Sequence, residues 1–352
     1  MITQHSTLDA TNVIIGVIII FLSSILLTGI VRRFALKHAV MDEPNDRSSH
    51  SNPTPVGGGI SISLCFLMGI ILLAVCSIIP VNIAVALGGG GLLVSIVAWM
   101  DDYKNILPIW RGTFYLLAAV WALFWIDGFN SIDLGVYEIR NPYVLNLLAV
   151  LGITWMTNLF NFMDGTDGIA GVQASSTAFL SGVLFWISAQ HGMAMLCFIL
   201  MAASSGFLVW NWPPARIFMG DVGSCLIGFS FGTLALIGEK TDSVPILLWI
   251  IMLAVFICDA TLTLFRRMLQ KKSWYSAHKS HAYQRFVQLG ASHKKLALWV
   301  LFTNVVILWP LALLAYNQKT LSIYMTLIAI ILVTVTWLVI QSRFKDMKST
   351  GN

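Results

Sequence analysis

The sequence predicts an all-α, polytopic integral membrane protein. Of its 352 residues, 57% are hydrophobic and only 11% are charged, whereas about a quarter of the residues in soluble domains are charged. Apolar runs recur along the chain, and most of them have about 20 residues, the length that crosses a bilayer core, although the run 114–126 is short. No internal repeat, low-complexity tract or soluble domain separates them. We therefore expect a single polytopic membrane domain over residues 1–352.

The first apolar run, 13–31, is followed by Arg32 and Arg33 and has no Lys or Arg before it. A cleaved signal peptide carries its positive charge before the apolar run, so the reversed order predicts an uncleaved helix with the N-terminus outside. Ten further runs lie near 60–79, 81–100, 114–126, 144–160, 169–189, 193–210, 225–237, 246–265, 296–316 and 321–340. Together these runs predict eleven transmembrane helices and a cytoplasmic C-terminus.

The distribution of Lys and Arg supports this topology. With eleven spans, alternate loops are cytoplasmic, and they contain all of the 21 Lys and Arg residues except Arg140, Lys240 and Lys319. Positive residues concentrate in the cytoplasmic loops of membrane proteins. This bias explains the net charge of +5 without nucleic-acid binding. The same topology places five acidic residues at cytoplasmic helix ends: Asp101, Asp102, Asp164, Asp167 and Asp221.

The segment 158–171 concentrates polar residues at the boundary of two spans. Asp164 and Asp167 are three residues apart, and so are Asn158 and Asn161, a spacing that turns each pair toward one side of a helix end. Polar groups at a bilayer boundary are energetically unfavourable and are usually functional. Oxygen ligands without neighbouring His or Cys suit a hard cation, so we expect Mg²⁺, with Mn²⁺ as the alternative.

Two other inner loops carry residues suited to phosphate or metal. In the loop 42–59, Arg47 and His50 stand in a run of hydrogen-bond donors suited to phosphate. The alternative is a solvated loop whose glycines let a helix begin close to its neighbour. In the next inner loop, the adjacent carboxylates of Asp101 and Asp102 repel each other unless a cation lies between them, and Lys104 follows to neutralise one or hold a phosphate. A charged helix terminus is the alternative there.

The inner loop 211–224 combines donors with glycines. Arg216 is placed to bind a phosphate and Phe218 to stack on a base, while Gly220 lets the main chain approach a ligand. Asp221 stands directly before an apolar run, so helix capping is the alternative to a functional role.

The last long inner loop is basic. His278 and His281 are three residues apart, but no third metal ligand accompanies them, so we expect this loop, with Arg285, to bind substrate rather than metal. Asp259 lies within the preceding apolar run, seven residues before Arg266, and an internal ion pair between the two is the simplest interpretation.

Four inner motifs, in this order, resemble the polyprenyl-phosphate N-acetylhexosamine-1-phosphate transferase family: residues 53–59, 101–104, 158–168 and 218–224. The resemblance implies ten or eleven spans and an outside N-terminus. It also implies Mg²⁺-dependent transfer of an N-acetylhexosamine 1-phosphate, or a 6-deoxy form, from a UDP-sugar to undecaprenyl phosphate. The reaction would take place at the cytoplasmic face of the bacterial inner membrane. A homodimer is open as an alternative to a monomer.

The resemblance also implies roles for the matched positions. Asp221 and Asn161 resemble the metal site, and Asp101 and Asp102 resemble the pair that handles the polyprenyl phosphate or the metal. Lys104, Asn158, Asp164 and Asp167 resemble the catalytic face, and Asn211 and Phe218 the uridine site. The segment 278–284 departs from the three-His run of the peptidoglycan enzyme. With 47–50, it resembles the transferases that start O-antigen synthesis.

Two other functions fit the composition. A flippase for lipid-linked sugars would place charges near the bilayer midplane, whereas the charges here fall at helix ends. A CDP-alcohol phosphotransferase would carry an Arg after the first Asp-Gly of its motif, and the segment 164–171 lacks it.

Overall fold

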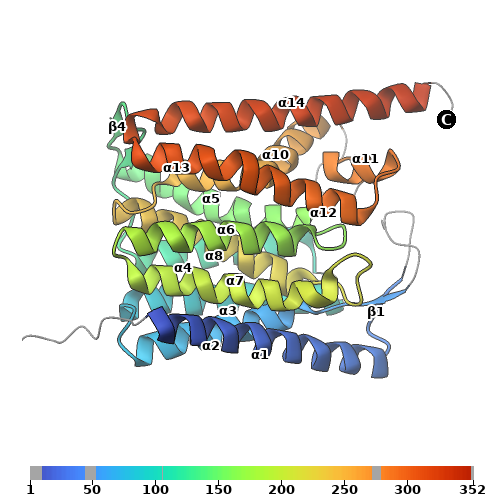
Figure 1. Cartoon of the computed structure of the whole chain (residues 1–352), viewed down its shortest axis with the longest axis horizontal. Helices are drawn as coiled ribbons and strands as arrows, with labels where there is room; N and C mark the ends of the chain where they lie inside the picture. Colours follow the sequence, from blue (N-terminus) through green and yellow to red (C-terminus); the bar gives the residue numbers. More distant parts are fainter. Residues whose placement is uncertain (1–9, 44–52, 105, 272–278, 350–352) are drawn as a thin grey trace, which may run out of the picture.

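The structure, a computed structural model, describes residues 10–43, 53–104, 106–271 and 279–349. The chain is almost entirely helical (Figure 1). Its long helices are α1 (Ala10–Lys37), α2 (Gly59–Val75), α3 (Val81–Lys104), α4 (Pro108–Trp125), α5 (Pro142–Met163), α6 (Ile169–Ile187), α7 (His191–Asn211), α8 (Asp221–Lys240), α10 (Ala254–Leu269) and α14 (Ser322–Ser349). The shorter elements are α9 (Ile246–Met252), α11 (Ala282–Gln288), α12 (His293–Phe302), the π-helical segment η1 (Thr303–Leu308), α13 (Trp309–Asn317) and the 3-10 turn η2 (Lys319–Leu321). Two antiparallel ribbons pair β1 (Met41–Asp42) with β2 (Thr54–Pro55) and β3 (Ile132–Asp133) with β4 (Glu138–Ile139).

The predicted all-α membrane class is confirmed. Among the described residues, eight helices are long and apolar enough to cross a membrane, or nine if the bent pair α9–α10 counts as one span. Helices α2 and α4 lie at the two remaining predicted positions. Neither is among the helices that are long and apolar enough to cross a membrane, and α2 has only 17 residues. The count of eleven crossings and the orientation of the chain therefore stay predictions.

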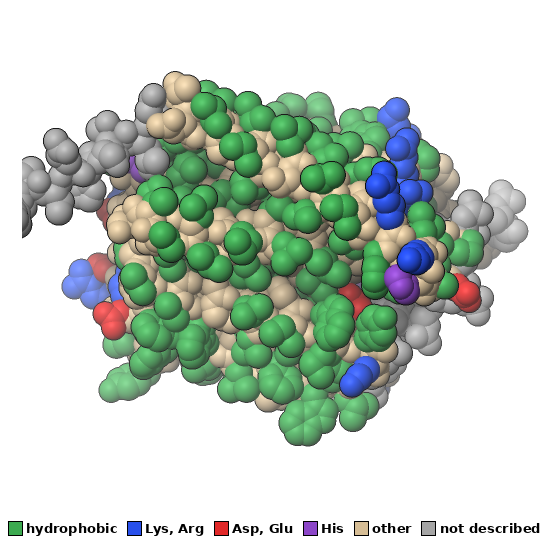
Figure 2. Space-filling model, turned by 90° about the horizontal axis from the view of Figure 1, so that it is seen from below, with side chains coloured by type: hydrophobic (Ala, Val, Ile, Leu, Met, Phe, Trp, Pro, Cys, Tyr) green, Lys and Arg blue, Asp and Glu red, His purple; other side chains and the backbone are tan. Residues whose placement is uncertain are grey.

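The long helices lie roughly side by side, so their ends gather at two opposite ends of the molecule (Figure 1). One end, toward which α3, α5 and α7 run and from which α2, α6 and α8 start, carries α11 and β1; we call it the motif end. Helices α6 and α8 are the most buried spans, and α1 and α14 the least. Figure 2 shows apolar side chains over the middle of one face and most of its visible Lys and Arg near the motif end.

Helices α2 and α8 begin in main-chain contact. A Cβ atom added to Gly59 would lie 2.5 Å from Gly223 Cα, so neither position has space for a side chain. The Gly58 N–H donates to Phe218 O (2.9 Å), and the Phe218 N–H donates to Pro55 O (2.8 Å). The first and fourth motifs are therefore joined through peptide groups. The glycines let α2 begin close to α8, which agrees with the alternative given above for the loop 42–59.

The α9–α10 pair is bent by 81°, and buried amides fix the bend. The Gln173 side chain on α6 donates to the Met252 carbonyl, which lies at the break (3.0 Å). Asn304, in η1, donates in turn to Gln173 Oε1 (3.1 Å) and to Ser176 Oγ (2.8 Å). A carbonyl released by a helix break has no water to bind inside a bilayer, so these amides satisfy it within the protein.

We predict that Gly223→Ala lowers the free energy of unfolding of the detergent-solubilised protein by about 1–3 kcal/mol, and with it the melting temperature. The added methyl group overpacks the contact between α2 and α8. Gly16→Ala in α1 is the matched control, since its added Cβ meets nothing within 4 Å. Thermal unfolding followed by circular dichroism measures both. An unchanged melting temperature for Gly223→Ala would contradict the close contact.

Candidate active site

Four carboxylates from three distant segments lie close together at the motif end. Asp101 and Asp102 stand on the last turn of α3, Asp164 directly follows α5, and Asp221 is the first residue of α8. The Asp221 N–H donates to Asp102 Oδ1 (3.3 Å). Asp164 is within electrostatic range of both Asp221 and Asp102. The turns between helices thus bring together acids that are more than a hundred residues apart in the chain.

One described guanidinium bridges two of these carboxylates. Arg111, in the first turn of α4, places Nη1 2.5 Å from Asp101 Oδ2 and 3.5 Å from Asp221 Oδ2. Asp101 also accepts a hydrogen bond from the Ile106 N–H (2.7 Å). Sequence reasoning missed Arg111. The available signal was that it is the only Lys or Arg between 105 and 139 and opens an apolar helix just after the Asp pair.

Among the described residues, the acidic side chains of the cluster outnumber its basic ones. Four carboxylates face one arginine, and Lys104 is exposed without an ion-pair partner among the described residues. Burial, followed by repulsion from Asp221 and Asp102, raises the pKa of Asp164 well above the ordinary range of a carboxyl group. A bound cation would remove this repulsion.

The donor atoms of the cluster suit a hard divalent cation. All four acids offer oxygen, and the Asn161 amide lies within hydrogen-bonding reach of Asp221 and 3.5 Å from Ser224 Oγ. Within the described ranges, no three His, Cys, Asp or Glu side chains converge on one ion position. Mg²⁺ typically takes only one or two protein carboxylates and fills its shell with water and substrate phosphate oxygens. The arrangement therefore fits an ion whose coordination the substrate completes.

Asp167 is engaged by protein groups on both sides. Its Oδ2 accepts the Ala215 N–H (3.0 Å), and its Oδ1 lies 3.2 Å from His293 Nδ1 at the start of α12. Burial alone would raise the pKa of Asp167, but the hydrogen bonds from His293 and Ala215 outweigh it and lower the pKa. Asp167 thus ties three segments together, and its catalytic role stays a prediction.

The two predicted asparagines outside the metal site also bind the main chain. Asn211 accepts the Gly168 N–H (2.8 Å) and donates to Ile217 O (2.9 Å), and its side chain is buried. Asn158 donates to Thr154 O in its own helix (2.9 Å). Asn211 therefore shapes the loop that presents the partly buried Phe218 and the exposed Arg216. Nucleotide contacts by these residues stay predictions.

Asp259 does not form the expected ion pair with Arg266, so that interpretation is wrong. Its carboxylate accepts the N–H groups of Ala282 (2.8 Å) and Tyr283 (2.9 Å), which begin α11, and lies 3.5 Å from Nδ1 of the buried His281. The first N–H groups of a helix lack internal partners and attract a carboxylate. Arg266 donates instead to Gln341 on α14.

Tyr283 supports the loop that carries Asp164, and sequence reasoning did not select it. Its hydroxyl donates to Phe162 O (3.0 Å), and a Cβ atom at Gly165 would lie only 2.1 Å from that hydroxyl oxygen. The contact spans 121 residues of chain, so no local spacing could reveal it. Asp259, through the start of α11, therefore fixes the main chain on both sides of Asp164.

Of the remaining predicted residues, Arg285 contacts α14 and the others lie outside the described residues. Arg285 lies over the Phe344 ring of α14, 4.7 Å from its centre. Burial, and secondarily the charge of Arg266, lower the pKa of Arg285 to about 10. Arg47, His50 and His278 lie outside the described residues.

The chain matches known proteins over most of its length. The model of glycosyl transferase family 4 matches residues 83–239. A probable undecaprenyl-phosphate N-acetylglucosaminyl 1-phosphate transferase of Bacillus subtilis is 27% identical over 91% of this chain and 90% of its own length. The undecaprenyl-phosphate alpha-N-acetylglucosaminyl 1-phosphate transferase of Escherichia coli K12 is 31% identical over 78% of this chain and 77% of its own length. These matches show that this chain belongs to glycosyl transferase family 4, among the polyprenyl-phosphate N-acetylhexosamine-1-phosphate transferases.

Proposed function

We propose that this protein transfers N-acetylhexosamine 1-phosphate from a UDP-sugar to undecaprenyl phosphate and releases UMP. The reaction would take place at the cytoplasmic face of the bacterial inner membrane and start an O-antigen or a related surface polysaccharide. The observation that carries the proposal is the cluster of four carboxylates and Arg111 at the ends of membrane helices. N-acetylglucosamine, the sugar in the relatives' names, is the first candidate, and 6-deoxy N-acetylhexosamines are the second.

The chemistry requires alignment more than proton removal. An oxygen of the polyprenyl phosphate attacks the sugar-bearing phosphorus of the donor, one P–O bond forms, and the P–O bond to UMP breaks. A phosphate monoester has its second pKa near 6, so the nucleophile is already largely dianionic at neutral pH. The protein must therefore orient two phosphate groups and neutralise their charge.

Named residues can perform this neutralisation. Asp221 and Asn161 would hold Mg²⁺, with Asp102 and Asp164 beside them, and the ion when bound would screen the pyrophosphate oxygens. Arg111 keeps Asp101 and Asp221 in place through its contacts with both. The exposed side chains of Lys104 and Arg216 are free to approach the substrate phosphates from the aqueous side.

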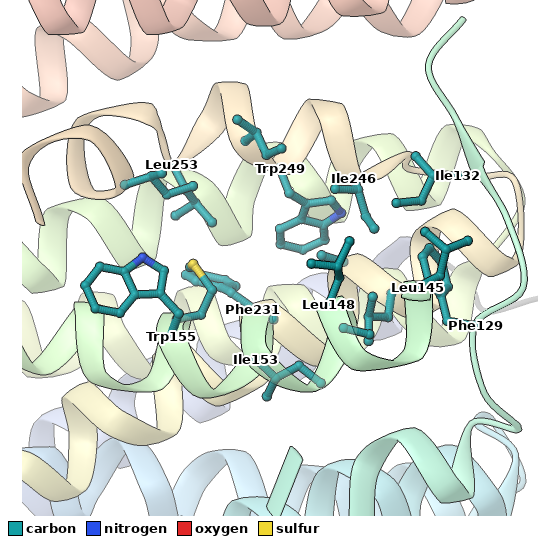
Figure 3. Close-up of a pocket in the computed structure, with 18 residues that line it drawn as sticks. Phe129, Ile132, Leu145, Leu148, Ile153, Trp155, Phe231, Ile246, Trp249 and Leu253 are labelled. Carbon is teal, nitrogen blue, oxygen red and sulfur yellow. The ribbon is translucent and has the colours of Figure 1, made fainter. Parts of the chain in front are cut away.

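An apolar pocket of about 340 Å³ suits part of the acceptor's hydrocarbon chain (Figure 3). It lies between α5, α8 and the bent α9–α10 pair, and its lining includes Leu148, Trp155, Phe231, Trp249 and Leu253. Helix α5 contributes Met156 to this pocket and ends beside Asp164. At 1.5 Å per residue, these two positions are only about 12 Å apart along the axis. Helix α5 thus connects the apolar pocket to the carboxylate cluster.

Turnover of purified protein with undecaprenyl phosphate and a panel of UDP-N-acetyl sugars tests the function. We expect UMP release that requires the polyprenyl phosphate and stops when EDTA removes divalent ions. Asp221→Asn should reduce the rate by more than about a hundredfold while the protein stays folded, and Asp127→Asn at the opposite end should keep full activity. Lipid movement without nucleotide turnover would support a transporter instead, and release of CMP from a CDP-alcohol would support the other enzyme class.

Asp164→Asn should stabilise the metal-free protein while impairing transfer. Because the folded-state pKa of Asp164 is raised, its contribution to stability is favourable below the unfolded-state pKa and is lost as the pH rises through the folded-state value. In EDTA, the variant should therefore melt about 2 °C or more above the wild type at pH 8, and the difference should shrink at low pH.

Added Mg²⁺ should reduce the difference in melting temperature between Asp164→Asn and the wild type at pH 8, because the ion relieves the repulsion in the wild type. Differential scanning calorimetry at two pH values, with and without Mg²⁺, measures these shifts. A variant less stable than the wild type in EDTA at pH 8 would show that the ionised Asp164 is not under repulsion.

Tyr283→Phe should lower kcat about three- to tenfold with little change in the KM for the donor. The substitution removes the hydrogen bond to Phe162 O that holds the Asp164 loop, and one such bond contributes about 0.5–1.5 kcal/mol. Tyr143→Phe, at a fully exposed position on α5, is the control. Steady-state kinetics separate the two constants, and a Tyr283→Phe enzyme with wild-type kcat would exclude this positioning role.

A further inference from the structure

A second pocket, of about 560 Å³, opens at the motif end between α11, α12 and α14. Its walls are apolar and include Phe286 of α11, Trp299 of α12 and Val339 of α14. Two cations, Lys295 and Arg343, complete the lining. In Figure 1, these three helices meet at the right-hand edge of the molecule. The pocket shares no lining residue with the apolar cavity between α5 and α8.

Among the described residues, the two cations have no acidic partner. Lys295 and Arg343 are both exposed, and in the described parts of the chain neither has a carboxylate within 4.0 Å. No described Asp or Glu lines the pocket. A pair of unpaired cations over an apolar hollow is complementary to an anionic head attached to a hydrocarbon chain.

The position of the pocket along the helices agrees with this chemistry. Lys295 lies in the first turn of α12 and Arg343 near the end of α14, so both charges stand at the motif end. Val335 and Val339 lie one to two turns deeper along α14, and about half of each side chain is exposed. The hollow thus changes from charged to apolar in the direction in which a membrane lipid changes from phosphate to acyl chain.

We propose that this pocket binds an anionic phospholipid of the adjoining membrane leaflet. Its phosphate lies between Lys295 and Arg343, and the first part of one acyl chain follows the wall formed by Phe286, Trp299 and Val339. A volume of 560 Å³ is within the range of sites that enclose small ligands. The site is distinct from the carboxylate cluster, because none of the four clustered carboxylates lines the pocket.

Native mass spectrometry of the full-length protein in detergent, titrated with phosphatidylglycerol or phosphatidylcholine of identical chains, tests the proposal. We expect tighter binding of phosphatidylglycerol. The double variant Lys295→Gln/Arg343→Gln should weaken that binding about tenfold or more, since each cation near an anionic membrane surface contributes about fivefold. The matched control, Lys294→Gln/Lys345→Gln, removes equal charge from exposed neighbours on the same helices that do not line the pocket.

Two results would overturn the proposal. Equal loss of phosphatidylglycerol binding in both double variants would assign the effect to diffuse surface charge. Displacement of phosphatidylglycerol by an equimolar amount of undecaprenyl phosphate would assign the pocket to the acceptor lipid. Val339→Trp adds an independent measurement, because it fills the hollow at an exposed position and leaves both cations in place. Phosphatidylglycerol binding should fall in this variant too, and unchanged binding would exclude the apolar wall as part of the site.

Discussion

Repulsion between carboxylates at adjoining helix ends is the constraint on which the rest of the motif end depends. In the part of the chain that the structure describes, Asp101, Asp102, Asp164 and Asp221 face a single arginine, and their ionised forms repel one another. Arg111 holds Asp101 and Asp221 through direct contacts, and further contacts fix the segments that carry the four acids. Helices α2 and α8 touch at glycines and share main-chain hydrogen bonds, and Asn211 and Asp167 tie their own loops to neighbouring segments. The acids are therefore held by the scaffold around them.

The α10–α11 region extends the same principle to the loop that carries Asp164. The 81° bend directs α10 so that Asp259 meets the first N–H groups of α11, and α11 then places Tyr283 against Phe162 and Gly165. Each step uses a group that a helix end or a loop leaves unsatisfied. The bend, the capping carboxylate and the tyrosine hydroxyl thus form one continuous path from the membrane interior to the site.

Much of this arrangement can be predicted from the sequence, and the rest cannot be predicted for physical reasons. Apolar runs predict the helices. The direction of the chain reverses from one span to the next, so every second loop lies at the same end, and this alone brings the acids of distant motifs together. The contacts of Arg111, Asp259 and Tyr283 depend instead on the rotation of each helix about its axis and on the paths of the loops. No short sequence pattern specifies either of these. Length and hydropathy also separate α2 and α4 from the longer spans, so helix positions are predictable here while the number of crossings is not.

The amide that closes the bend in α9–α10 has a consequence for how the chain is made. Gln173 precedes the carbonyl of Met252 by 79 residues, so a ribosome delivers the donor to the translocon well before the break emerges. Hydrocarbon offers no substitute partner for that carbonyl. The bent pair can therefore leave the translocon at low energy only beside an α6 that is already inserted, which fixes an order of assembly during biosynthesis.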